Sequence, residues 1–162
     1  MSRAQKILIA TAMLLIASTM AFGVIYAIFD EHQTLVGMGT LMATGFMEAA
    51  GGDMQTAFEA LDSYGALSRE YGFEIHSHGH WGMLSLVLII LALVFERLGL
   101  SKGQGVALAW LLALSATLFP LGVLMQIGPM AQVGKILSIP ASLGLLAGLL
   151  IAVVSLIRNP SA

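Results

Sequence analysis

The sequence predicts an all-α integral membrane protein, built as a four-helix transmembrane bundle with a short extracytoplasmic amphipathic segment. Hydrophobic residues make up 58% of the chain and charged residues only 10%, whereas soluble globular domains average roughly 25% charged residues. Four separate apolar runs are each long enough to cross a hydrocarbon core about 30 Å thick. With 162 residues, the chain has room for one domain covering residues 1–162.

The four spans are expected at about residues 7–29, 78–97, 106–126 and 136–157. The first run is longer than the apolar core of about 7–15 residues found in signal peptides, so we expect it to be a retained span. In the fourth run, Gly144 and Gly148 form a G-x-x-x-G pair. Such pairs let two helix backbones approach closely, which predicts helix packing at this position.

The charged residues are distributed unevenly between the two sides of the predicted bundle. One side carries five of the seven basic residues, Arg3, Lys6, Arg97, Lys102 and Arg158. The positive-inside rule then places both termini in the cytoplasm, and we expect the membrane to be a bacterial inner membrane. The net charge of -2 excludes nucleic acid as a partner, because phosphate binding requires a cluster of Lys and Arg.

The long segment between the first two spans, residues 30–77, holds eight of the nine acidic residues. In its second half, Met54, Phe58 and Leu61 recur at helical spacing behind Asp53, a preferred N-cap residue. This pattern predicts an amphipathic helix, which either lies on the surface of the lipid bilayer or forms a lid over a site.

The histidines form the candidate site. His76, His78 and His80 alternate at the outer end of the second span, and His32 stands at the outer end of the first. In one continuous helix, His76 and His80 share a face while His78 points nearly the opposite way. One helix therefore cannot present all three to a single ion, so either the segment is extended here or at least one histidine has another role.

Two glycines beside the histidines, Gly79 and Gly82, form a notch of small residues. The notch would let a flat macrocycle or a neighbouring helix come close. Neutral imidazole is a common ligand for transition metals, and haem needs only one or two axial histidines and a large apolar slot. This combination predicts a haem b site.

In the expected haem site, His76 or His78 binds the iron, and His80 or His32 is a second ligand or a distal group. An open sixth position on the iron would serve a small apolar substrate, a gas or redox chemistry. A first alternative is a copper or zinc site that combines the histidines with outer methionines or with Glu74. A second alternative is an accessory subunit of a membrane complex, whose histidines only contact lipid headgroups or a partner.

The start of the second span resembles a known haem helix. His76-Ser77-His78 resembles the H-x-H that opens a haem-ligating helix in the haem-copper oxidase and nitric oxide reductase superfamily. The companion histidines that this superfamily carries on later helices have no counterpart here, because no histidine follows His80. The resemblance covers one helix and excludes a complete oxidase centre.

Across all four spans, the chain resembles styrene oxide isomerase, a small four-helix membrane enzyme that carries haem b and acts as a homo-oligomer. The resemblance rests on Phe22-Gly23-Val24, His76-Ser77, Gly82-Met83, Gly128-Pro129 and Pro140. It implies a haem-dependent membrane isomerase or oxidoreductase in which His76, or His78 with a shift, binds the iron. Trp81 stands where that family has asparagine, and the third span lacks the family's tyrosine.

Overall fold

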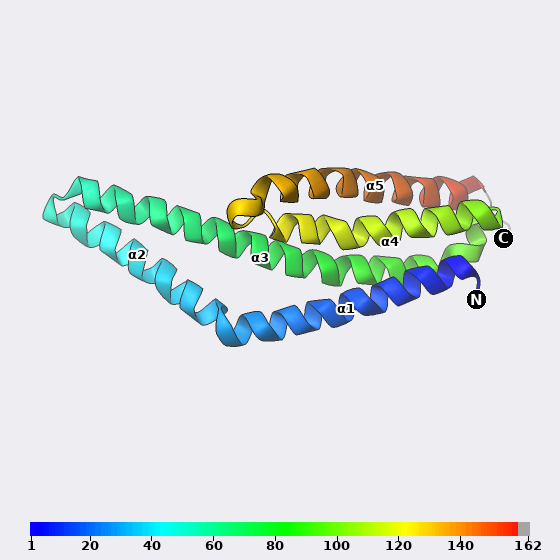
Figure 1. Ribbon diagram of the computed structural model, residues 1–162, viewed down its shortest axis with the longest axis horizontal. Helices are drawn as coiled ribbons and strands as arrows, with labels where there is room; N and C mark the ends of the chain where they lie inside the picture. Colours follow the sequence, from blue (N-terminus) through cyan, green and yellow to red (C-terminus); the bar gives the residue numbers. More distant parts are fainter. Residues whose placement is uncertain (159–162) are drawn as a thin grey trace. The chain divides into compact units, whose positions relative to one another are not determined.

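The computed structural model describes residues 1–158, which are almost entirely helical (Figure 1). The helices in chain order are α1 (Arg3–Phe29), α2 (Glu31–Gly51), α3 (Met54–Val94), η1 (Phe95–Leu98), α4 (Lys102–Leu124), η2 (Gly128–Met130) and α5 (Ala131–Arg158). No β-strand occurs in this described part of the chain. The predicted all-α fold class is therefore confirmed.

Within residues 1–158, four helical stretches are long and apolar enough to cross a membrane: Arg3–Phe29, Met54–Leu98, Lys102–Leu124 and Gly128–Arg158. Each of them contains or overlaps one predicted span. The predicted boundaries differ from the observed helix ends mainly for the second span. The class of a four-helix transmembrane bundle is confirmed.

The second span belongs to a helix that begins much earlier than predicted. α3 starts at Met54 rather than near residue 78 and has 41 residues, which is about 60 Å at 1.5 Å per residue. A hydrocarbon core of about 30 Å covers only half of this length. The other half of α3 therefore extends beyond the core, which agrees with the extramembrane segment predicted for residues 30–77. No proline interrupts residues 54–94, and a helix propagates more easily than it nucleates.

The segment 30–77 contains two helices rather than one short amphipathic helix, because α2 occupies its first half. Gly52 makes the turn between them with a φ of 86°, a conformation that glycine adopts without strain. Asp53 caps α3 as predicted, since its carboxylate accepts hydrogen bonds from the Thr56 amide (3.1 Å) and from the Thr56 hydroxyl (2.8 Å). These two bonds lower the pKa of the Asp53 carboxyl.

The chain divides into two compact units, which we describe separately. The bundle unit comprises Met1–Met20 and His76–Ala162, and the structure describes the second of these stretches up to residue 158. The hairpin unit comprises Ala21–Ile75. The boundary between the units falls after Met20 in α1 and before His76 in α3, so the three histidines of α3 belong to the bundle unit.

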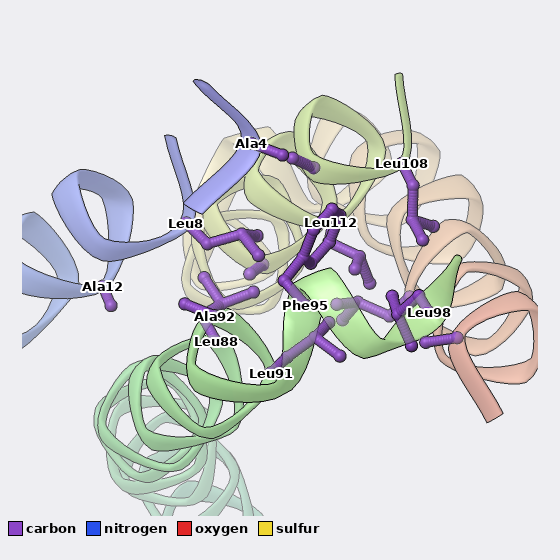
Figure 2. Packing of buried hydrophobic residues seen from close by; sticks show 14 of the residues in the cluster. Ala4, Leu8, Ala12, Leu88, Leu91, Ala92, Phe95, Leu98, Leu108 and Leu112 are labelled. Carbon is purple, nitrogen blue, oxygen red and sulfur yellow. The ribbon is translucent and has the colours of Figure 1, made fainter. Parts of the chain in front are cut away.

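Large aliphatic side chains fill the centre of the bundle unit (Figure 2). Leu8 of α1, Leu88 of α3 and Leu112 of α4 are each 0–1% exposed. Gln5 of α1 donates from its side-chain Nε2 to the Ala92 carbonyl of α3 at 3.0 Å. Because lipid tails are as apolar as leucine, close packing and such interhelical hydrogen bonds are what hold these helices together.

The helices α4 and α5 pack along a seam of small residues. A Cβ added at Gly122 would lie 2.6 Å from the backbone nitrogen of Ser138. A Cβ at Gly148 would lie 2.6 Å from Leu112 Cδ2, and one at Gly144 would meet a hydroxyl of the facing helix. At Gly122 the two backbones can come this close only because no side chain lies between them, and Gly144 and Gly148 make room for side chains of α4. These contacts confirm the helix packing predicted at Gly144 and Gly148.

In the hairpin unit, α2 and the first part of α3 pack as an antiparallel pair. A Cβ at Gly45 would lie 3.4 Å from Leu61 Cγ, and one at Gly37 would lie 3.2 Å from Leu67 Cδ2. The exposed fractions of Phe46 and Phe58 are 70% and 60%. The unit therefore leaves apolar surface uncovered, as an element lying against a membrane surface would.

Candidate functional site

The three histidines of α3 lie on an unbroken helix. His76 and His80 are one turn apart on the same face, with ring centroids 6.3 Å apart. His76 is exposed and His80 is half-buried. The alternative of an extended histidine segment is therefore wrong, and the shared face predicted for His76 and His80 is confirmed.

His80 also contacts α4 within the bundle unit. Its ring lies 4.9 Å from the ring of Phe119, with 56° between the two planes, which is the geometry of a tilted aromatic pair. The contact with Phe119 limits the rotation of the His80 imidazole. The sequence alone did not single out Phe119, because spacing within α4 does not tell which residue of α3 it faces.

Gly82 packs against α1, whereas Gly79 is open. A Cβ at Gly82 would lie 3.5 Å from Thr19 Cγ2, but one at Gly79 would meet nothing within 4 Å. His78 shares the side of the helix with Gly82. The buried Thr19 hydroxyl finds no hydrogen-bond partner in the described part of the chain, unlike Thr117, which donates to the carbonyl four residues earlier. Only Gly79 of the predicted glycine notch therefore has free space beside it.

The fourth histidine belongs to the hairpin unit. His32 lies in the first turn of α2 with an exposed side chain. Within residues 1–158, no group of three or more His, Cys, Asp or Glu side chains is arranged to hold a metal ion. The predicted ligands thus reduce, within the bundle unit, to the His76–His80 pair on one face of α3 and His78 on another.

A second cluster, which sequence reasoning missed, surrounds Tyr26 in the hairpin unit. Tyr26 is 6% exposed; its ring stacks on Phe22, with centroids 5.8 Å apart, and lies 6.4 Å from Tyr71. The Glu74 carboxylate acts on the Tyr26 hydroxyl electrostatically, but no acceptor in residues 1–158 meets hydrogen-bond geometry with it. Matching the apolar faces of α1 and α3 is the only sequence signal that would have found this cluster.

The fold and these side chains define an all-α integral membrane protein whose second transmembrane helix carries a histidine pair near the polar end of its apolar stretch. No family model, no curated protein and no solved structure matches the chain. The resemblances to styrene oxide isomerase and to the haem-copper oxidases therefore rest only on the residues quoted for them.

Proposed function

We propose that this integral membrane protein binds haem b and that His80 is the axial ligand of the iron. The observation that carries the proposal is the His76–His80 pair, in which the ring of Phe119 positions one imidazole. Haem requires an axial imidazole and an apolar surface for the macrocycle. His80 meets the first requirement because it is half-buried and held on one side by an aromatic ring.

The face of α3 that carries the pair also offers space for a macrocycle. A Cβ at Gly79 would meet nothing within 4 Å, and Met83, one turn further along the same face, is 67% exposed. On the other side of the helix, the contact between Gly82 and Thr19 leaves no slot for a flat group. This contrast favours His80 over His78 as the ligand.

His76 lies one turn from His80 toward the acidic segment of the chain. In the proposed site, His76 would donate a hydrogen bond to a haem propionate. Because His76 is exposed and Gly79 is open, lipid or a second copy of the chain would cover the outer side of the haem. A second copy in this place would form the homo-oligomer that the sequence resemblance implies.

An iron held by His80 alone would keep one coordination position for another ligand. It would then supply Lewis-acid chemistry toward a small apolar substrate that enters from the bilayer, or serve as a gas or redox site. We therefore propose a haem-dependent isomerase or oxidoreductase. Carbon monoxide added to the reduced protein should shift the Soret band, and an unchanged spectrum would show that both axial positions are filled.

The haem proposal is tested by purifying the protein in mild detergent after expression with haem supplementation. We expect a Soret band, with iron and porphyrin in equal amounts by metal analysis and pyridine haemochrome assay. His80→Ala should lose most of the haem, whereas His78→Ala, a histidine on the other side of the same helix, should retain it. A colourless wild-type preparation, or equal losses from the two variants, contradicts the proposal.

The same histidine pair favours a second candidate, a copper or zinc ion shared by His76 and His80. Side chains four residues apart on a helix are neighbours, and the ring separation of 6.3 Å permits both to approach one ion. Zinc sites usually have three or four protein ligands, and no such group occurs in the part of the chain that the structure describes. Copper or zinc without porphyrin, lost equally in His76→Ala and His80→Ala, would support this candidate.

We also propose that both termini lie in the cytoplasm of a bacterial cell. Arg3 of α1 and Lys102 of α4 line one pocket at the same end of the bundle unit, as the positive-inside rule expects of the cytoplasmic end. A fluorescent protein fused to the C-terminus should fluoresce, because it folds well only in the cytoplasm. If alkaline phosphatase fused to that terminus is active instead, the C-terminus lies outside the cytoplasm and the proposed orientation is wrong.

A further inference from the structure

The cytoplasmic end of the bundle unit contains a pocket that the haem proposal does not use. Its volume is about 640 Å³, and its walls come from the start of α1, from η1 and from the start of α4. Ala4, Phe95 and Val106 supply apolar lining, and the first two are labelled in Figure 2. The volume falls in the range of roughly 300–1,000 Å³ that is typical of small-molecule sites.

Three charged residues line this pocket: Arg3, Lys102 and Glu96. Two cations and one carboxylate complement a headgroup that carries a phosphate and a primary ammonium. Arg and Lys both bind phosphate oxygens, while a carboxylate accepts hydrogen bonds from an ammonium. A choline headgroup lacks such donors, and a purely anionic headgroup would meet the repulsion of Glu96.

A second cavity of about 320 Å³ adjoins the first, since Leu100 lines both. It is lined along α4 by Gln104, Ala107, Leu108 and Leu111, and by Ile151 of α5. From Gln104 to Leu111 the helix rises by about 10 Å, so this apolar cavity runs from the pocket toward the membrane interior. A charged pocket that adjoins an apolar groove fits an amphiphile better than a water-soluble phosphate.

We propose that this end of the bundle unit binds a phosphatidylethanolamine molecule of the cytoplasmic leaflet. Its phosphate contacts Arg3 and Lys102, its ammonium contacts Glu96, and one acyl chain follows α4 past Leu100. Basic pockets between transmembrane helices are a known mode of lipid headgroup binding. The site does not involve the histidines of α3, so it does not depend on the haem proposal.

The test measures lipid binding to the delipidated full-length protein in detergent by native mass spectrometry and thermal unfolding. We expect phosphatidylethanolamine to bind more tightly than phosphatidylglycerol or phosphatidylcholine and to raise Tm. Lys102→Gln should weaken binding about fivefold, as expected for one basic group at a phosphate. Lys135 is a basic residue that lines neither cavity. The variant Lys135→Gln is therefore the matched control and should bind the lipid as the wild type does.

Two further variants separate the headgroup contacts from the pocket itself. Glu96→Gln should remove the preference for phosphatidylethanolamine over phosphatidylglycerol while the variant still binds both. Gly103→Leu should fill the pocket and abolish binding without unfolding the protein, because Gly103 lines the pocket and a Cβ there would meet nothing within 4 Å.

Three results would overturn the proposal. Equal binding of phosphatidylcholine would show that the headgroup is not recognised. Equal effects of Lys102→Gln and Lys135→Gln would show that the pocket is not the site. Stabilisation by phosphoethanolamine alone, as strong as that by the lipid, would show that the acyl groove has no part in binding.

Discussion

Replacing Gly122 by alanine tests whether the small-residue seam between α4 and α5 stabilises the bundle unit. The added Cβ would lie 2.6 Å from the backbone nitrogen of Ser138 and 2.8 Å from the carbonyl oxygen of Gly134. Ordinary contact begins near 3.4 Å, so the helices must separate by roughly 0.8 Å, which weakens dispersion contacts along the seam. Overpacking costs about 1–3 kcal/mol, and backbone neighbours cannot rotate away, so the upper end applies.

The higher helix propensity of alanine, about 1 kcal/mol, offsets part of this cost, and we expect a net loss of about 2 kcal/mol. The assay is reversible unfolding in mixed micelles by increasing the fraction of sodium dodecyl sulfate, followed by tryptophan fluorescence. Gly144→Ala should lose less, because the Ser115 hydroxyl that it meets can rotate.

Gly103→Ala is the control for the Gly122 prediction, because its Cβ would meet nothing within 4 Å. It should leave the stability unchanged or slightly raised. If Gly122→Ala proves as stable as Gly103→Ala, the close approach of the two backbones is not what holds α4 against α5, and the packing argument fails.

Three other predictions follow from single contacts. Leu112→Ala should cost about 2–5 kcal/mol in the same unfolding assay, because Leu112 is 0% exposed and leaves a cavity; the exposed Leu114→Ala should cost about 0.5 kcal/mol or less. Phe119→Ala should lower haem retention by releasing the histidine ring that Phe119 contacts, and unchanged retention would contradict that role. The lowered pKa of Asp53 means that its cap stabilises α3 at neutral pH and that this contribution disappears as the pH falls through the folded pKa. Asp53→Asn should flatten this acid dependence, measured by hydrogen exchange at the Thr56 amide, and an unchanged profile would exclude the cap as its source.

Hydrophobicity located the transmembrane spans well wherever charges bound them. Glu96 and Arg97 ended the second span in the sequence, and α3 with η1 ends at Leu98, because burying a charge in hydrocarbon is costly at any position. The start of α3 was predicted poorly for the opposite reason. Nothing in residues 54–77 breaks a helix, so the polar and apolar halves of α3 form one continuous element.

The sequence likewise predicted one part of the candidate site and missed another. Helical periodicity was sufficient to place His76 and His80 on one face, since side chains four residues apart always share a face. It gave no information about Phe119, which meets His80 only because α4 packs beside α3 in the bundle unit. The two glycines looked equivalent in the sequence, yet Gly82 contacts α1 while Gly79 remains open.

By itself, the sequence determined the membrane class, the four crossings, the Asp53 cap and the small-residue pair in α5. Each of these depends on local hydrophobicity or on spacing within one helix. The tertiary structure decided which faces meet, and so decided the neighbour of His80 and the grouping of Arg3, Glu96 and Lys102 around one pocket. The physical reason is that the apolar faces of transmembrane helices are chemically alike, so the steric fit of their side chains selects the partners.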